Sequence, residues 1–293
     1  MLTVVGTVPQ PDFPLLEGVV SAEAGGITIA GRHLEAKRGT PALLAAALAT
    51  ARALGGVEVR ACLVGDVGLG DGSRKLYRHL TEVLPRRDCA VLTFHYLQPD
   101  VDWHNRVLFA VEEMPIRPLL VADAGFMYAA KMSGQAGAYD LFTPDAGELA
   151  FLADERAPHP FYTRGFILQD EDGAPELIAR AYLHENAARH LLVKGRVDYM
   201  ADQGGVWASV SEPSHPALEA IGGTGDTLTG MVSALLAAGL EMRPACRLAA
   251  RANRLAGDLA QPDPATQVAA IIAHIPQALA ALGQGHGMAK AGS

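Results

Sequence analysis

The chain has 293 residues, of which 49% are hydrophobic and 19% charged, with a formal net charge of -8. This balance is typical of a globular protein with a sizeable core, and the negative charge argues against a general nucleic-acid-binding surface. No run of about 18 apolar residues is present to span a membrane, and the start of the chain lacks the basic flank of a secretory signal. The three cysteines lie far apart and form no metal-type pair. We therefore expect a cytoplasmic protein that binds neither nucleic acid nor membranes.

Strand-like and helical segments alternate through the first half of the chain. Helix signals include Thr40 as N-cap and a proline in the first helical turn. The segments follow in this order: strand 2–5, β-branched run 25–31, helix 42–54, strand 57–64, helix 74–84, strand 89–94, helix 102–113 and strand 118–122.

The second half continues the alternation. Its expected segments are strand 139–143, a helix from residue 144, helix 175–190, strand 191–194, strand 207–210 and helix 231–240. Buried apolar strands alternating with helices are typical of a parallel sheet covered by helices on both faces. The sequence therefore predicts a three-layer α/β/α fold with a mostly parallel central sheet.

The chain is organised around the glycine-rich turn 222–230, whose sequence is GGTGDTLTG, and the apolar helix expected after it. Unpaired backbone N–H groups collect at a helix N-terminus, where the helix dipole also favours an anion. A carboxylate at such a site would repel a bound phosphate. Asp226 is therefore interpreted as a general base that takes a proton from a hydroxyl beside the phosphate. The alternative is that Asp226 only caps the helix, since aspartate is a favoured N-cap residue.

Acidic side chains follow other predicted strands, at the edge where ligands of parallel sheets bind. Asp123 comes directly after the strand 118–122, and Asp145 and Glu148 come after the strand 139–143. Acidic groups gathered at this edge can hold a hydrated Mg²⁺ against phosphates. Each of them can alternatively cap the helix that follows.

Several segments together resemble a known family. They are residues 223–230 (GTGDTLTG), residues 143–148 (TPDAGE), Lys194-Gly195 at a strand end, and the closing stretches 255–260 and 268–279. With these segments the chain resembles the ribokinase-like superfamily. Within that superfamily it is most similar to the ADP/ATP-dependent NAD(P)H-hydrate dehydratases.

The resemblance implies one ribokinase-like α/β domain over residues 1–282, with ATP or ADP and Mg²⁺ beside the glycine turn. Members of the family use the nucleotide to phosphorylate a hydroxyl, and in the dehydratases the phosphate then leaves, which restores the damaged nicotinamide cofactor. The expected partner is thus a small-molecule substrate. Residues 283–293 have the composition of a disordered tail. Related folds often associate, so a homo-oligomer stays open.

Site residues follow from the resemblance by position. Phosphate is expected on the backbone of Gly223, Thr224 and Gly225, with Asp226 as catalytic base. The other expected contacts are nucleotide-binding Lys194, Gly195 and Asn253, substrate-binding Gly39, His95, Asp123 and Asp145, and Glu148 holding the metal through water. The residues themselves leave three alternatives open: Lys194 ending in solvent, Asn253 as an exposed helix residue, and His95 with a structural role.

Three departures from the family pattern lie on the acceptor side of the site. A glycine-rich turn is replaced by residues 94–99 (FHYLQP), an Asp-Ala-Asp-Ala-Leu segment by residues 122–126 (ADAGF), and a histidine by Asp145. Without a glycine, the backbone at 94–99 cannot approach a ligand as closely. The phosphate side is intact, so the substrate is in doubt more than the reaction class.

Three functions follow from this pattern. The first is nucleotide-dependent dehydration of hydrated NAD(P)H. The second is a kinase for a small hydroxylated metabolite, such as a sugar, a vitamin precursor or a thiazole alcohol. The third is a protein that binds nucleotide without catalysis.

Overall fold

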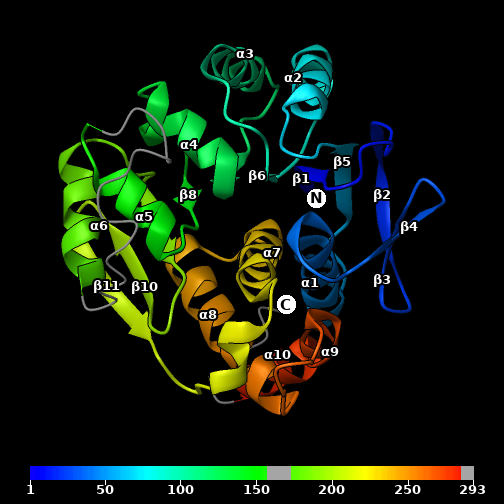
Figure 1. Cartoon of the computed structure of the whole chain (residues 1–293), viewed down its shortest axis with the longest axis vertical. Coiled ribbons are helices and arrows are strands. Elements are labelled where there is room, and N and C mark those ends of the chain that lie inside the picture. Colours follow the sequence, from blue (N-terminus) through cyan, green and yellow to red (C-terminus); the bar gives the residue numbers. More distant parts are fainter. Residues whose placement is uncertain (157–172, 285–293) are drawn as a thin grey trace, which may run out of the picture.

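A sheet of eleven strands is the centre of the computed structural model, which describes residues 1–156 and 173–284 (Figure 1). The strands lie side by side in the order β11-β10-β9-β8-β7-β6-β1-β5-β2-β3-β4. Their bounds are β1 (Leu2–Val8), β2 (Leu16–Glu23), β3 (Gly26–Ile29), β4 (Arg32–Glu35), β5 (Val59–Gly65), β6 (Val91–His95), β7 (Leu119–Ala122), β8 (Leu141–Phe142), β9 (His190–Val193), β10 (Asp198–Asp202) and β11 (Gly205–Val210).

The middle of the sheet is parallel. β1 pairs in parallel with β5 and β6, and parallel pairing continues from β6 through β7 and β8 to β9. β10 and β11 add antiparallel strands at one end, and β2, β3 and β4 do so at the other. Every residue of β6 is buried, which is expected where helices cover both faces of a sheet. The predicted mostly parallel, helix-covered sheet is confirmed.

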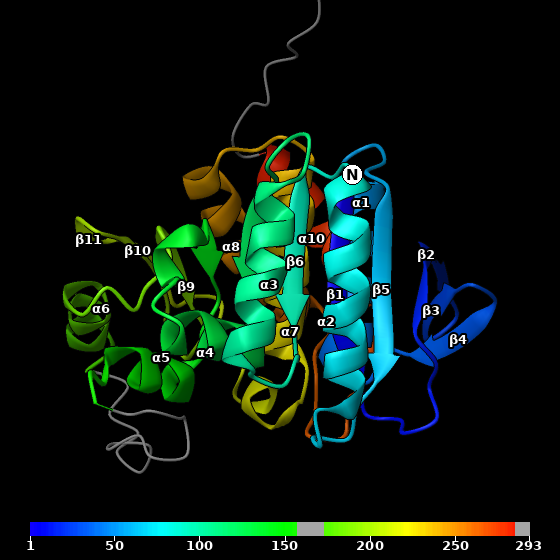
Figure 2. The same ribbon diagram turned by 90° about the horizontal axis from the view of Figure 1, so that it is seen from above.

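Helices cover both faces of the sheet (Figures 1 and 2). The helices on one face are α1 (Gly39–Ala53), α7 (Thr224–Ala237), α8 (Met242–Leu259), α9 (Val268–Ala273) and α10 (Ile275–Gln284). Those on the other face are α2 (Asp71–Val83), α3 (Val101–Glu112), α4 (Ala124–Met132), α5 (Ala146–Ala153) and α6 (Ala174–Leu183). Within the described residues, no helix is both long and apolar enough to cross a bilayer.

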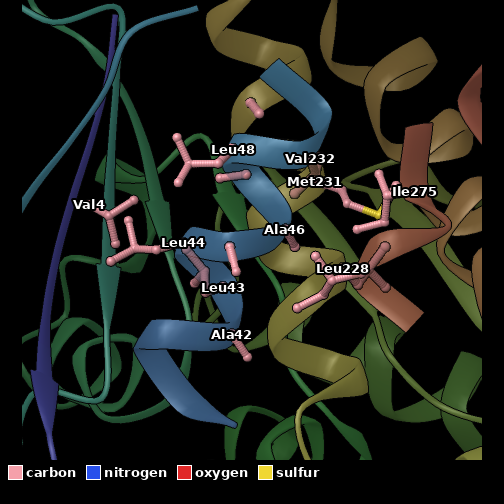
Figure 3. Packing of buried hydrophobic residues seen from close by; sticks show 14 of the residues in the cluster. Val4, Ala42, Leu43, Leu44, Ala46, Leu48, Leu228, Met231, Val232 and Ile275 are labelled. Atoms are coloured by element: carbon pink, nitrogen blue, oxygen red, sulfur yellow. The ribbon is translucent and has the colours of Figure 1, made fainter. Parts of the chain in front are cut away.

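Helices α1 and α7 pack closely at the centre of the first face (Figure 3). Leu43 of α1 and Met231 and Val232 of α7 are fully buried there. The close approach depends on the last glycine of the 223–230 motif, because a Cβ at Gly230 would lie 2.1 Å from the carbonyl oxygen of Leu43. This contact fixes α7, whose N-terminus forms the site described below.

We predict that Gly230→Ala destabilises the protein by about 1–3 kcal/mol, because the added methyl group overpacks the α1–α7 contact. Gly137→Ala is the matched control, since a Cβ at Gly137 would meet nothing within 4 Å. Denaturant unfolding measures both free energies. Equal effects of the two substitutions would contradict the proposed role of Gly230.

The structure moves two predicted helix boundaries. α7 begins at Thr224 rather than at residue 231, so the glycine motif forms the first turns of the helix instead of a loop before it. The helix predicted over 175–190 ends at Leu183, because Glu185 adopts a left-handed backbone with φ 57. The antiparallel strands β2, β4 and β10 were not predicted as strands.

The predicted single domain over residues 1–282 stays a prediction. Of the predicted tail, residues 285–293 lie outside the described residues.

Candidate active site

A cavity of about 1020 Å³ opens at the carboxyl ends of the parallel strands. This is the edge where ligands of open α/β sheets bind. Ten of the predicted site residues line the cavity: Asp123, Asp145, Glu148, Lys194, Gly195, Gly223, Thr224, Gly225, Asp226 and Asn253. The other two, Gly39 and His95, are bonded to Asp226.

The N-terminus of α7 presents free backbone donors to this cavity. Gly223 is the N-cap residue, with a left-handed φ of 101 that suits glycine. The N–H of Thr227 makes the first bond of the helix, 2.9 Å to the carbonyl oxygen of Gly223. The N–H groups of Thr224, Gly225 and Asp226 therefore have no partner within the helix. A phosphate fits this arrangement of donors and helix dipole.

Asp226 does not cap α7, because the capping position belongs to Gly223 and carries no side-chain bond. Its Oδ2 accepts a hydrogen bond of 2.6 Å from the N–H of Gly39, and its Oδ1 lies 3.1 Å from Nε2 of His95. Burial alone raises the pKa of Asp226, but His95, the Lys194 charge and the Gly39 N–H outweigh it and lower the pKa below its ordinary value. The carboxylate is therefore ionised at neutral pH.

His95 is fully buried, which corrects the prediction that it contacts a substrate directly. It ends β6, beneath the first turn of α7, and its Nδ1 lies 3.0 Å from the Thr40 hydroxyl. That hydroxyl donates its proton to the Thr7 carbonyl at 2.8 Å, so His95 Nδ1 must donate to Thr40. Nε2 faces the Asp226 carboxylate, so His95 lies between Thr40 and Asp226 and holds that carboxylate in place.

Lys194 and Asp123 form a buried ion pair at the floor of the cavity. Lys194 Nζ lies 2.9 Å from both carboxylate oxygens of Asp123, and its side chain is only 13% exposed. Burial lowers the pKa of Lys194, but the charges of Asp123 and Glu148 outweigh this effect and raise it. The alternative in which Lys194 ends in solvent is thus wrong. The side chain of Lys194 lies against the first turn of α7, where its Cδ would be 3.4 Å from a Cβ added at Gly225.

The carboxylate of Asp123 is satisfied inside the protein, and its predicted contact with a substrate stays a prediction. Besides Lys194, it accepts bonds from the Thr229 hydroxyl at 2.7 Å and from the Ala124 N–H at 2.8 Å. The second bond makes Asp123 the N-cap residue of α4, so the capping alternative holds. Thr229 escaped prediction, although it lies three residues after Asp226 and so on the same face of α7.

Asp145 and Glu148 form a capping box at the start of α5. Asp145 Oδ1 accepts from the Glu148 N–H, and Glu148 Oε2 accepts from the Asp145 N–H, each at 2.8 Å. The Tyr128 hydroxyl donates to Glu148 Oε1 at 3.2 Å. Burial raises the pKa of Glu148, and the Lys194 charge opposes this rise. Asp145 is therefore a helix cap at the rim of the cavity, and its contact with a substrate stays a prediction.

The donor set at this site fits a hydrated Mg²⁺ rather than a protein cage. Over the described residues, the only cluster of three side chains spaced for a metal lies elsewhere in the molecule. Glu148 nevertheless offers carboxylate oxygens to the same cavity as the α7 N-terminus. Mg²⁺ is commonly bound by one or two carboxylates together with water and substrate phosphates.

The last predicted residues, Asn253 and Gly195, are held by internal bonds beside the cavity. Asn253 accepts from the Thr227 hydroxyl at 2.7 Å and donates to the Thr224 carbonyl at 3.1 Å, so it supports the first turn of α7. The alternative, in which Asn253 is only an exposed helix residue, is therefore wrong. The Gly195 N–H donates to Asp198 at 3.2 Å.

Arg254 fixes the loop after β9 and was missed from the sequence. Its Nε bonds Asp198 at 2.7 Å, and its Nη2 bonds the carbonyls of Gly195 and Arg196 at 2.8 Å. This buried guanidinium orients the loop that follows Lys194. Nothing in the local spacing of residues 250–258 marks it, because its partners lie 43 to 59 residues away in the chain.

The segment 94–99 was predicted to lie on the acceptor side of the site, and one of its residues, Tyr96, lines the cavity. Tyr96 has a left-handed φ of 54, a conformation in which glycine is unstrained, and its side chain is 47% exposed. Its ring lies 3.7 Å from the Cβ position of Gly39. The segment packs against the start of α4, where a Cβ at Gly125 would lie 1.9 Å from the Leu97 carbonyl oxygen. Gly125 thus allows α4 to approach the backbone of the segment 94–99 closely, and this contact lies within the protein.

Comparisons with known proteins find a matching family model and several proteins of similar sequence. The family model described as NAD(P)H-hydrate dehydratase matches residues 99–277. An uncharacterized protein of Methanocaldococcus jannaschii is 40% identical over 223 residues, which cover 76% of this chain and 91% of that protein. The ADP-dependent (S)-NAD(P)H-hydrate dehydratase of Cenarchaeum symbiosum is 30% identical over 155 residues. That match covers 53% of this chain and 48%, about half, of the archaeal enzyme.

Solved structures share the fold. A ribokinase-like superfamily protein from Enterococcus faecalis superposes with a TM-score of 0.60 at 15% identity, covering 96% of this chain and 86% of that one. The predicted ribokinase-like fold is confirmed.

Proposed function

We propose that this chain, which belongs to the NAD(P)H-hydrate dehydratase family, catalyses the nucleotide-dependent dehydration of hydrated NAD(P)H. The reaction would act on a small molecule in the cytoplasm. One observation carries it: an ionised carboxylate, Asp226, lies in the same cavity as the unpaired N–H groups of the α7 N-terminus.

The phosphate side would bind the transferable phosphoryl group of ATP or ADP. The N–H groups of Thr224, Gly225 and Asp226 would donate to its oxygens, and Lys194 would add positive charge beside Gly225. Glu148 would hold Mg²⁺ through water, and the ion would neutralise charge on the phosphates. Phosphoryl transfer needs mainly such positioning and charge neutralisation from a protein.

On the acceptor side, a carboxylate oxygen of Asp226 would take the proton of the acceptor hydroxyl. Gly39 contacts one oxygen of this carboxylate and His95 the other, so both hold it in place. The hydroxyl oxygen would then form a bond to phosphorus as the bond to the nucleotide breaks. In the dehydration, the C–O bond would break and phosphate would leave with its electron pair, and loss of a proton from the neighbouring ring carbon would restore the double bond of the nicotinamide.

The test is recovery of reduced nicotinamide absorbance. Purified protein is incubated with hydrated NADH and Mg²⁺, with ATP, with ADP, or with no nucleotide. The proposal predicts that absorbance returns only with a nucleotide, and that phosphate is released in equal amount. No recovery over prolonged incubation with either nucleotide would reject dehydration as the activity.

The exposed Tyr96 ring supports a second candidate, a kinase for another small hydroxylated metabolite. Its side chain occupies the place where the resembled family carries a glycine-rich turn, so it reshapes the acceptor side while the phosphate side is unchanged. Such a kinase would convert nucleotide to a stable phosphorylated product. A broad acceptor screen without turnover would count against it.

We predict that Tyr96→Gly changes the KM for the acceptor several-fold and leaves nucleotide affinity within about twofold. The substitution removes the ring above Gly39 and releases about 1–3 kcal/mol of strain stored in the left-handed backbone. Steady-state kinetics and nucleotide titration measure the two effects. Leu69→Gly, at another exposed apolar residue, is the control. An unchanged acceptor KM would show that Tyr96 does not contact the acceptor.

A further inference from the structure

A second cluster of reactive side chains lies away from the active site, where β2 and β5 pair. Glu17 and Cys62 are direct partners across these antiparallel strands, so their side chains project from the same face of the sheet. His79 of α2 packs over this face, with Nε2 3.0 Å from Glu17 Oε2. One ligand atom from each of the three side chains lies within 4.8 Å of the others.

The three donors suit a borderline metal ion. A thiolate, an imidazole and a carboxylate are the ligand types that bind Zn²⁺, with bonds of about 2.0 to 2.3 Å. Those bond lengths place tetrahedral ligand atoms about 3.3 to 3.6 Å apart. In the structure His79 Nε2 and Glu17 Oε2 lie 3.0 Å apart, and all three ligand atoms lie within 4.8 Å of one another. Rotation of these side chains would bring the three atoms to tetrahedral spacing around an ion. Softer Cu⁺ and harder Mg²⁺ each match fewer of the three donors.

We propose that Glu17, Cys62 and His79 form a Zn²⁺ site with one open coordination position. The open position has space, because Glu17 and Cys62 line a cavity of about 310 Å³. The three ligands come from β2, β5 and α2. A bound ion would therefore link the antiparallel strand β2 to β5, a strand of the parallel part of the sheet, and to the helix α2.

A neighbouring arginine orients the carboxylate of Glu17. Arg87 Nη2 lies 2.5 Å from Glu17 Oε1, which leaves Oε2 turned toward His79 and the thiol. Such a bond to the remote oxygen orients a metal-ligating carboxylate. Glu17 and the Cys62 thiolate would together balance the charge of Zn²⁺ beside the arginines of the cavity wall, which are Arg60, Arg86 and Arg87.

The test uses the full chain after treatment with a chelator. Zn²⁺ is titrated against a colorimetric chelator, and Co²⁺ is added separately as a spectroscopic probe. We expect one equivalent of Zn²⁺ and a thiolate-to-Co²⁺ charge-transfer band in the wild type. Cys62→Ser should abolish the band and weaken Zn²⁺ binding at least about tenfold, and His79→Gln should weaken binding likewise.

Cys89→Ser is the matched control, because Cys89 is also buried and lines the same cavity but is not part of the cluster. It should keep both the affinity and the band. The proposal is overturned if the wild type shows no thiolate band, or if Cys62→Ser and Cys89→Ser bind Zn²⁺ equally well. Absence of the wild-type Co²⁺ band overturns the proposal even where a variant does not fold, and a band that persists in Cys89→Ser assigns the thiolate to another cysteine than Cys89.

Discussion

Asp226→Asn is expected to lower the turnover rate by about 10²- to 10⁴-fold, the usual worth of general-base catalysis. The substitution removes the charge that would take the acceptor proton, while the N–H groups at the start of α7 remain. Nucleotide affinity should therefore change by no more than a few-fold. Initial rates with hydrated NADH, together with calorimetric nucleotide titration, measure the two effects on the same preparation.

Asp145→Asn is the matched control for this substitution. Its carboxylate lines the same cavity, but it acts as the N-cap of α5, a role that asparagine fills equally well. We expect its rate to stay within a few-fold of the wild type. If Asp226→Asn keeps a comparable rate, the carboxylate is not the base. If it loses nucleotide binding together with the rate, its effect is structural.

Lys194→Met should destabilise the protein by about 3 kcal/mol or more. This is a large share of the free energy of unfolding of a typical protein, which is about 5–15 kcal/mol. The substitution leaves Asp123, itself 1% exposed, without its countercharge. The bonds from Thr229 and Ala124 remain and satisfy part of the carboxylate. Urea unfolding at neutral pH measures the loss, and phosphate affinity of the folded protein should fall as well.

Two further variants separate a buried ion pair from the general effect of losing a lysine. Lys37→Met breaks an exposed pair with Glu35 and should cost about 0–1 kcal/mol. The double variant Lys194→Met/Asp123→Asn removes both buried charges and should recover part of the stability lost in Lys194→Met alone. A loss from Lys194→Met no larger than that from Lys37→Met would mean that the pair contributes nothing to the fold.

The features predicted well from the sequence were those that depend on residues close together in the chain. Apolar strands alternating with helices indicated the parallel sheet, and residues 223–230 indicated a glycine-rich segment at a helix N-terminus. Both depend on neighbours within a few residues, which spacing and residue type reveal directly. The boundary of α7 was nevertheless misplaced, because the glycines and threonines of the motif, weak helix formers, are helical in the packed structure.

The bonds that position the site depended on partners far apart in the chain. His95 and Asp226 are separated by 131 residues, and Lys194 and Asp123 by 71. Spacing cannot show which of these groups meet, so a buried histidine was interpreted as a substrate contact. Asp145 shows the opposite case, since its bond to Glu148 spans three residues and the capping alternative was visible in the sequence.

The contact between Gly125 and Leu97 has a consequence for engineering. The partner is the backbone carbonyl of Leu97, so replacing the side chains of residues 94–99 by glycine would leave the contact in place. Position 125 should therefore reject any larger residue both in the parent chain and in a graft that keeps this backbone path.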